Sequence, residues 1–167
     1  MKTHIFVIYT LFAYGVGLGS QALADEGGSS IERGRYLVTI GGCNDCHTPA
    51  YAEQGGKVPE SEWLVGSPVG FHGPWGTSYP ANLRLAVQQL NESAFIARAR
   101  SQMLPPMPWF NLVAMSDDDL KSIYRFIVSL GPAGAAMPVA VAPGATPTTP
   151  YIEFVPRVDA PVKVSSN

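Results

Sequence analysis

Cys43-Asn44-Asp45-Cys46-His47 is the stretch of sequence that decides how this chain folds. It holds both cysteines of a 167-residue chain. A scaffold stapled by several disulfides is therefore excluded. The pattern is C-x-x-C-H, in which two thiols are separated by two residues and a histidine follows the second thiol directly.

The C-x-x-C-H spacing is the signature of covalent c-type haem attachment. A tight turn of two residues lets Cys43 and Cys46 reach two vinyl groups on adjacent edges of one porphyrin and form thioethers. His47 is then held beneath the iron as the proximal axial ligand. Its imidazole must be neutral to ligate, and its other ring nitrogen needs an acceptor, for which a backbone carbonyl in residues 55–70 is a candidate. One covalent haem c is the expected cofactor.

Three other uses of the cysteines remain open at this point. A thioredoxin-like redox pair requires a βαβ context, which the sequence does not display. A zinc site would need His72 as its fourth ligand, and the adjacency of Cys46 and His47 suits a tetrahedral metal poorly. A disulfide between Cys43 and Cys46 would close a small, strained ring.

The residues before the motif resemble an export signal. Lys2 is followed by an almost wholly apolar run from Ile5 to Leu18 and by the A-x-A site Ala22-Leu23-Ala24. This pattern predicts a secretory signal peptide over residues 1–24. The run is short for a membrane span of about 20 residues, although an uncleaved anchor remains an alternative. We expect a periplasmic protein with no membrane span after cleavage.

The mature chain is expected to contain three short helices. Ser29-Ser30-Ile31-Glu32 is a capping box that predicts a helix from about 30 to 41, and Asn91 caps a second helix that runs to about Gln102. Ser116 caps the last helix, which has an apolar stripe and ends at Gly131. The stripe consists of Leu120, Ile123, Tyr124, Ile127 and Val128.

The rest of the chain is rich in glycine and proline. Residues 48–82 hold six glycines and five prolines and predict a long ordered loop. Residues 132–167 form a Pro/Ala-rich tail, expected to be extended, in which Tyr151 to Val155 are apolar enough to dock on the domain. Residues 25–131 then form one small domain. Three short helices make a poor hydrophobic core for such a domain unless a large apolar group fills the middle of the domain.

A second axial ligand is expected on the other side of the iron, most often a methionine. Met107 lies within Pro105-Pro106-Met107-Pro108, whose prolines stiffen the segment and preorganise a weak thioether ligand. Met107 is also compatible with a role as a core filler. Met103, Met115, Met137 and His72 are the other candidates; we expect Met115 in the core and His72 in a loop.

These residues together resemble a class I cytochrome c. The resemblance covers about residues 30–131. It rests on Gly34-Arg-Tyr-Leu37 before the C-x-x-C-H motif, on the proline-flanked Met107 and on Ser116-Asp-Asp-Asp-Leu120 at the start of the last helix. It implies an all-α cytochrome c fold, with few short helices and long loops around a covalently bound haem. It also implies that the first and last helices cross, with Gly34 and Tyr124 in the roles of the glycine and the aromatic residue at the contact.

A narrower resemblance points to the cytochrome c subunits of bacterial periplasmic alcohol or aldehyde dehydrogenases. The stretches that carry it are Gly34 to Val38, Gly73 to Leu83 and Leu104 to Leu112. Such subunits often have two or three C-x-x-C-H sites, whereas this chain has one. The departure favours a single-haem carrier or a single-haem subunit over a multi-haem relay.

Polar and aromatic loop residues are candidates for the walls of the haem pocket. Trp75, Tyr79 and Asn82 carry donors suited to haem propionates, and Trp109 is placed to pack beside Met107. Anchoring of the loops against the core explains each aromatic residue equally well. A solvated face explains Arg84, Arg98 and Arg100 better than pairing with propionates does.

The expected function is periplasmic electron transfer by a His47/Met107-ligated haem. A periplasmic dehydrogenase as donor and another cytochrome or an oxidase as acceptor are the expected partners. Only 14% of the residues are charged, the net charge is −2 and no basic run occurs, so nucleic acid is not expected as a partner. Two alternatives are a fixed electron-transfer subunit of a larger dehydrogenase, and a haem peroxidase or ligand sensor with an open iron site.

Overall fold

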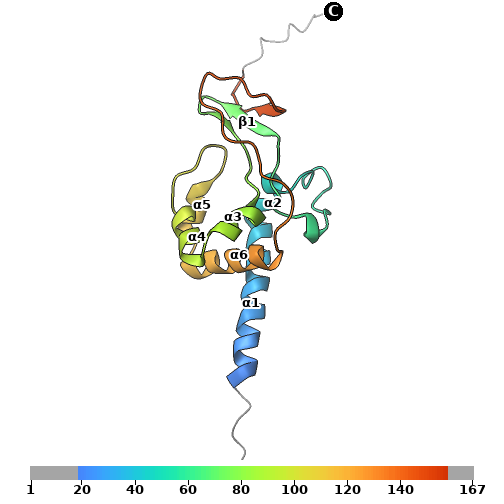
Figure 1. Cartoon of the computed structure of the whole chain (residues 1–167), viewed down its shortest axis with the longest axis vertical. Coiled ribbons are helices and arrows are strands. Elements are labelled where there is room, and N and C mark those ends of the chain that lie inside the picture. Colours follow the sequence, from blue (N-terminus) through green and yellow to red (C-terminus); the bar gives the residue numbers. More distant parts are fainter. Residues whose placement is uncertain (1–18, 158–167) are drawn as a thin grey trace, which may run out of the picture.

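The computed structural model describes residues 19–157 (Figure 1). Helices surround the middle of the molecule, and a small sheet lies at the end away from the crossing of the first and last helices. The helices are α1 (Gly19–Ile40), α2 (Cys43–His47), α3 (Leu83–Ala86), α4 (Glu92–Ala99), α5 (Trp109–Ala114) and α6 (Asp117–Ser129), with the short 3-10 helices η1 (Glu60–Glu62) and η2 (Val87–Gln89).

Helices α1 and α6 cross in close contact at Gly34 (Figure 1). A Cβ on Gly34 would lie 2.0 Å from the backbone oxygen of Ser122 and 2.7 Å from Cβ of Phe126. The glycine therefore lets the two backbones approach. The aromatic residue at this contact is Phe126, whereas Tyr124 packs against Phe95 of α4 with ring centroids 5.5 Å apart.

The hydrophobic core lies beneath this crossing. Leu120, Ile123 and Ile127 of the expected α6 stripe are buried, but Val128 is 41% exposed. Phe126, which the stripe omitted, is fully buried. The buried face of α6 is thus rotated toward Phe126, because that side packs on α1. The other members of the core are Leu37, Val38, Leu64, Val87 and Ala99.

Helix α1 begins earlier than the sequence predicted. It starts at Gly19, so Ser29 and Ser30 lie inside the helix and do not cap it. Residues 19–28 continue the helix toward the N-terminus, and their carbonyls are the natural acceptors for the N–H groups that a cap would otherwise satisfy. Residues 1–18 of the expected signal peptide lie outside the described residues. Within the part described, no helix combines the length and apolarity needed to cross a membrane.

The caps of the later helices confirm the sequence prediction. The Asn91 side chain accepts from the N–H of Ala94, and the Ser116 side chain accepts from the N–H of Asp119. Helix α4 ends at Ala99 rather than near Gln102. Helices α3 and α5 were not predicted, since segments of four and six residues hold too few positions to display a helical period.

The expectation of an all-α fold is wrong in one respect, because a three-stranded sheet is present. Strands β1 (Gly70–Gly73) and β2 (Gly76–Ser78) form an antiparallel hairpin within the predicted loop 48–82. Strand β3 (Tyr151–Glu153) pairs in parallel with β1, which gives the order β2-β1-β3. Strands of three or four residues show no alternation that a sequence pattern can detect.

The described part of the tail, residues 132–157, is extended and docks on the domain, as its composition predicted. It leaves α6, runs along the middle of the molecule and ends in β3 at the sheet (Figure 1). Val141 exchanges two backbone hydrogen bonds with Thr77 of β2, at 2.8 and 2.9 Å. The described part of the tail is thus fixed against the hairpin.

Candidate functional site

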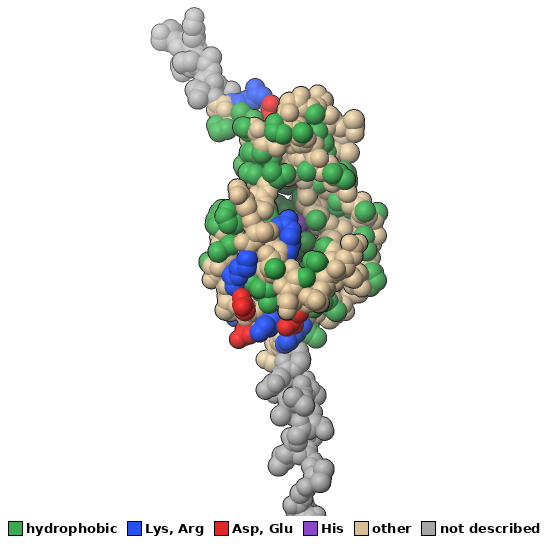
Figure 2. Space-filling view, turned by 60° about the vertical axis from the view of Figure 1, so that its left-hand side comes forward, with side chains coloured by type: hydrophobic (Ala, Val, Ile, Leu, Met, Phe, Trp, Pro, Cys, Tyr) green, Lys and Arg blue, Asp and Glu red, His purple; other side chains and the backbone are tan. Residues whose placement is uncertain are grey.

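A cavity of about 400 Å³ lies between the C-x-x-C-H helix α2 and the loop after α4. Figure 2 shows a hollow on this side of the molecule, with a histidine visible in it, a basic side chain at its rim and mostly hydrophobic and other uncharged atoms around the rest. The lining is predominantly apolar and comes from every part of the domain. It includes Val38, Cys43, Cys46, His47, Phe71, Tyr79, Leu83, Val87, Arg98, Met103, Leu104, Met107, Met115 and Ile127.

Both cysteines of the motif line this cavity from α2. Gly42, at φ 68°, turns the chain sharply between α1 and α2. Both thiols are free; Cys43 is half-buried and Cys46 is exposed. Burial raises the pKa of Cys43 to about 11, and burial together with Asp45 raises the pKa of Cys46. A redox-active dithiol requires a lowered thiol pKa, so the thioredoxin-like alternative is not supported.

His47 is buried and tied to the backbone on one side. Its Nδ1 lies 2.7 Å from the carbonyl oxygen of Ala81, and its side chain lines the cavity. Burial lowers the pKa of the imidazole, against the opposing effect of this hydrogen bond. The ring is therefore neutral at pH 7. With Nδ1–H donating to Ala81, the lone pair is on Nε2, the state a metal-binding histidine needs.

A backbone carbonyl in residues 55–70 was a candidate acceptor for His47, but the acceptor is the carbonyl of Ala81. Residues 64–67 instead connect the two partners. The N–H of Gly66 donates to the carbonyl of His47 at 2.8 Å, and the N–H of Ser67 donates to Pro80 at 3.1 Å. Residues 64–67 therefore do not accept from His47 themselves. They position the backbone of His47 and the backbone next to Ala81 relative to each other.

A buried polar pair inside the motif was missed by sequence reasoning. The Thr48 hydroxyl donates to Oδ1 of Asn44 at 2.7 Å and accepts from the N–H of Leu64 at 2.8 Å. Both side chains are almost fully buried. The only sequence signal for this pair was its i, i+4 spacing, with Asn44 and Thr48 on either side of Cys46 and His47. The pair anchors residues 64–67 to α2.

Three methionines line the cavity: Met103, Met107 and Met115. Met115 also packs against the core cluster, as the sequence predicted. Met107 lies in a segment tied to strand β2, since the Ser78 hydroxyl donates to the carbonyl of Pro105. The fourth candidate, Met137, lines a separate pocket.

The predicted pocket residues are only partly brought together. Tyr79 lines the cavity. Asn82 has other partners: its Oδ1 accepts from Leu85 N–H at 3.0 Å and caps α3, and its Nδ2 donates to the tail. Trp75 lies at the hairpin turn near Phe154, and its buried Nε1 has no partner. Trp109 is not part of the cavity wall and packs on Phe110. The propionate roles of Trp75, Tyr79 and Asn82 stay predictions, as does the contact of Trp109 with Met107.

Two of the three arginines, Arg84 and Arg100, differ from the expected solvated face, and the third, Arg98, agrees with it. Arg84 is 5% exposed, and its guanidinium donates to the carbonyls of Ser61, Leu130 and Gly131. Arg100 donates to the carbonyls of Leu112 and Met115, at 2.9 and 2.8 Å, and clamps the chain between α5 and α6. Only Arg98 is exposed, and it borders the cavity.

The other uses of the motif find no support. Nδ1 of His72 lies 2.8 Å from the Thr77 hydroxyl within the hairpin, and His72 does not line the cavity. Among residues 28–157, whose side chains the structure describes, no group of three or more His, Cys, Asp or Glu side chains is able to hold a metal ion. Zinc therefore lacks a ligand set there.

The cavity suits a large, flat, apolar cofactor joined to the chain by its two thiols. Its volume falls in the range of about 300–1,000 Å³ that is usual for cofactor sites, and its wall is mostly apolar with few polar groups. The neutral His47, beside the two thiols, presents a nitrogen lone pair of the kind that a metal ligand needs. These features define a c-type haem protein.

The comparison with protein families agrees with this class. The family model described as Cytochrome c matches residues 31–131, more than half of the chain. The chain belongs to the cytochrome c family, whose members bind haem c and transfer electrons. No curated protein and no solved structure matches the chain. The narrower resemblance to dehydrogenase subunits therefore gains no support from relatives.

Proposed function

We propose that this chain is a periplasmic single-haem electron carrier, with haem c bound through Cys43 and Cys46 and with His47 and Met107 as axial ligands. The observation that carries the proposal is the single apolar cavity lined by all four of these residues. The bound haem supplies the redox chemistry, cycling between its ferric and ferrous states. The chain orients the haem, excludes water from it and tunes its reduction potential.

The hydrogen bond to Ala81 supports His47 as the proximal ligand. An acceptor on Nδ1 fixes the tautomer and the orientation of the ring, and it makes Nε2 a stronger donor to a metal. Because the carbonyl belongs to the backbone, it does not titrate near neutral pH. His47 therefore keeps one protonation state while the protein is oxidised and reduced.

Two observations support Met107 over the neighbouring methionines. Met115 is engaged in the core, whereas Met107 is absent from the core cluster. The Met107 segment is held by Ser78 at Pro105 and by the hydrogen bond from Trp109 N–H to the Met107 carbonyl at 2.9 Å. A thioether on a fixed backbone loses little entropy on binding iron, so a weak ligand becomes adequate.

The experiment is a set of three matched variants, Met103→Ala, Met107→Ala and Met115→Ala. The oxidised full-length protein should show the near-infrared band of a sulfur–iron bond. We expect Met107→Ala alone to abolish the band, while the other two variants keep it. Retention of the band in Met107→Ala would overturn the ligand assignment. Rapid peroxide turnover by the unmutated protein would instead favour the peroxidase with an open iron site.

Export and partners belong to the same proposal. Cleavage after Ala24 would leave Asp25 as the first residue, which the intact mass of protein purified from a Gram-negative periplasm tests directly. A dehydrogenase is proposed as donor, and another cytochrome or an oxidase as acceptor. An intact mass that includes residues 1–24, together with retention in the membrane, would favour the uncleaved anchor, whereas cleavage at another position would contradict the predicted site.

The second candidate is a fixed electron-transfer subunit of a periplasmic dehydrogenase. Exposed large hydrophobic side chains favour it, since Phe110 is 61% exposed and Ile152 and Phe154 are each 51% exposed. Such side chains often mark protein interfaces. Purification from the native host decides between the two: a stoichiometric partner subunit supports the fixed subunit, and a free monomer supports the carrier.

A further inference from the structure

The match to the cytochrome c family model ends at Gly131, but residues later in the chain also line the cavity. Pro138 and Ala140, which lie beyond the matched residues, line the same cavity as the C-x-x-C-H motif. The segment that leads to them begins at the end of α6 and crosses the middle of the molecule to reach the sheet (Figure 1). Part of the cofactor site is therefore built by residues outside the family domain.

This segment is fastened to the domain at its near end, before it reaches the cavity. The Asn82 side chain donates to the carbonyls of Ala133 and Ala135, at 2.8 and 3.1 Å. Asn82 directly follows Ala81, the acceptor of the His47 hydrogen bond. The first fastening point is thus next to the proximal histidine.

The segment is fastened again beyond the cavity. Val141 exchanges two backbone hydrogen bonds with Thr77, and the Thr149 hydroxyl lies 2.8 Å from the Tyr79 hydroxyl. The N–H of Phe154 then donates to the carbonyl of His72 at 2.7 Å, alongside β3. Pro138 and Ala140 are therefore held between fixed points on both sides.

Two glycines of the domain leave the space that the segment fills. A Cβ on Gly66 would lie 2.5 Å from Cγ of Met137, and a Cβ on Gly76 would lie 2.1 Å from the backbone oxygen of Val141. Both glycines have positive φ, at 82° and 92°. Only glycine adopts this conformation readily while admitting so close a neighbour.

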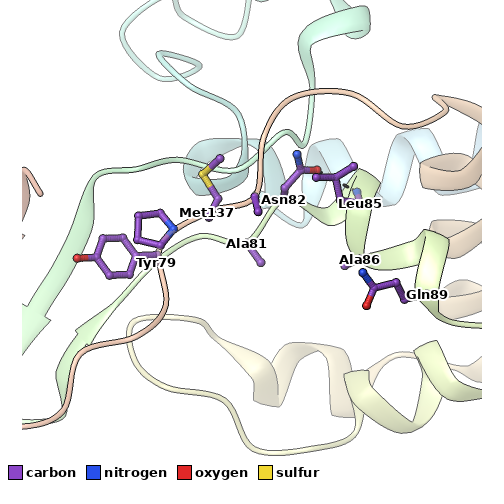
Figure 3. A pocket seen from close by; sticks show the side chains of 9 residues that line it. Tyr79, Ala81, Asn82, Leu85, Ala86, Gln89 and Met137 are labelled. Atoms are coloured by element: carbon purple, nitrogen blue, oxygen red, sulfur yellow. Dashed lines mark hydrogen bonds between the residues drawn. The ribbon is translucent and has the colours of Figure 1, made fainter.

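Figure 3 shows how the segment covers this part of the domain. Met137 and Tyr79 lie on one side of a second pocket, of about 280 Å³, while Leu85 and Gln89 of the α3 region lie on the other. Tyr79, Ala81, Ala86 and Pro138 belong to the linings of both this pocket and the main cavity. The partition between the two is thus made by three residues of the domain together with Pro138 of the segment.

We infer that residues 132–157 are a structural part of the haem-binding site and close one edge of it to water and to redox reagents. The inference rests on the proposed function. A covered edge lowers the local dielectric, which disfavours the more positively charged ferric state and raises the reduction potential. A covered edge also keeps small reductants at a distance, so electrons enter and leave through the edge that remains open.

The first test is a chain that ends after Ala136. It keeps the carbonyls that accept from Asn82 and removes Pro138, Ala140 and β3. The control is a chain that ends after Arg157, which removes residues 158–167 alone. We expect the first chain to show a lower reduction potential and faster one-electron reduction by ascorbate, while the control matches the full-length protein. The sulfur–iron band of the full-length protein should persist in both.

A pair of point variants tests the same inference in the complete chain, and it decides the matter if the shortened chain does not fold. Gly76→Ala places a methyl group against the Val141 carbonyl, whereas Gly144→Ala, also at positive φ, meets no atom within 4 Å. The conformational penalty is thus similar in the two variants, and only the first displaces the segment. We expect Gly76→Ala alone to lower the potential and speed reduction by ascorbate.

An unchanged potential and an unchanged ascorbate rate in both the shortened chain and Gly76→Ala would overturn the inference. Such a result would leave the proposed function intact, because the full-length protein would still show its haem and sulfur–iron spectra. The absence of a c-type haem spectrum from the full-length protein would instead refute the proposed function itself.

Discussion

Replacing Gly34 with alanine tests the close contact between helices α1 and α6. The added Cβ would lie 2.0 Å from the Ser122 oxygen, about 1.4 Å short of an ordinary contact at 3.4 Å. Its neighbours are backbone atoms of Ser122 and Cβ of Phe126, neither of which rotates out of the way. Helix α6 must therefore shift, and it carries the core residues Leu120, Ile123 and Ile127.

The size of the effect follows from two opposing contributions. Overpacking of a close contact costs about 1–3 kcal/mol and sometimes more. Alanine gains up to about 1 kcal/mol over glycine inside a helix. The clash is with rigid atoms, so the cost prevails. The upper part of the overpacking range less the gain from alanine leaves a net loss of about 1–2 kcal/mol. At about 4–8 °C per kcal/mol for a domain of about 100 residues, a fall in Tm of about 4–16 °C is expected.

The assay is thermal unfolding of the haem-loaded protein followed by circular dichroism, with Gly28→Ala as the matched control. Gly28 lies in the same helix, and a Cβ there meets nothing within 4 Å. The control should lose no stability. An unchanged Tm in Gly34→Ala, or an equal fall in both variants, would refute the reasoning from close contact.

Two further predictions concern buried polar groups that hold the site. Thr48→Val leaves the Leu64 N–H and Asn44 Oδ1 without their partner, and it should cost about 2–4 kcal/mol in urea unfolding while Thr48→Ser restores most of the loss. Arg84→Lys keeps the charge but lacks the fork that reaches three carbonyls, so it should lower stability by about 2–4 kcal/mol with the haem spectrum preserved. An unchanged urea midpoint in either Thr48→Val or Arg84→Lys would contradict the corresponding contact.

Signals that lie within a few neighbouring residues were readable from the sequence. The caps Asn91 and Ser116 were predicted and are confirmed, because a capping side chain bonds a backbone group only three residues away. The grouping of Cys43, Cys46 and His47 is equally local, and the structure brings all three to one cavity. Met107 was a prediction from its prolines, and it lines the same cavity.

Errors arose where the partner is distant in the sequence. Arg84 was expected on a solvated face, but its acceptors lie as far away as Gly131. Residues 55–70 were only a candidate source of the His47 acceptor, which is Ala81, positioned by the backbone hydrogen bonds of residues 64–67. Strand β3 was missed because it pairs Ile152 with the distant Phe71, whereas the hairpin was missed because its strands are too short to show an alternating pattern.

The sequence by itself determined the chemistry: two thiols and an imidazole at a spacing that only a covalent haem explains well, on a chain with too few helices to fill its own middle. The tertiary structure alone decided what surrounds that group. The Ala81 carbonyl meets His47, the Leu64 N–H meets Thr48, and the tail that carries Pro138 and Ala140 lines the cavity, all through contacts between segments distant in the sequence. The physical reason is that the spacing of the two thiols and the imidazole is a property of neighbouring residues. Burial of the cavity depends on contacts between distant segments, which form only in the folded state.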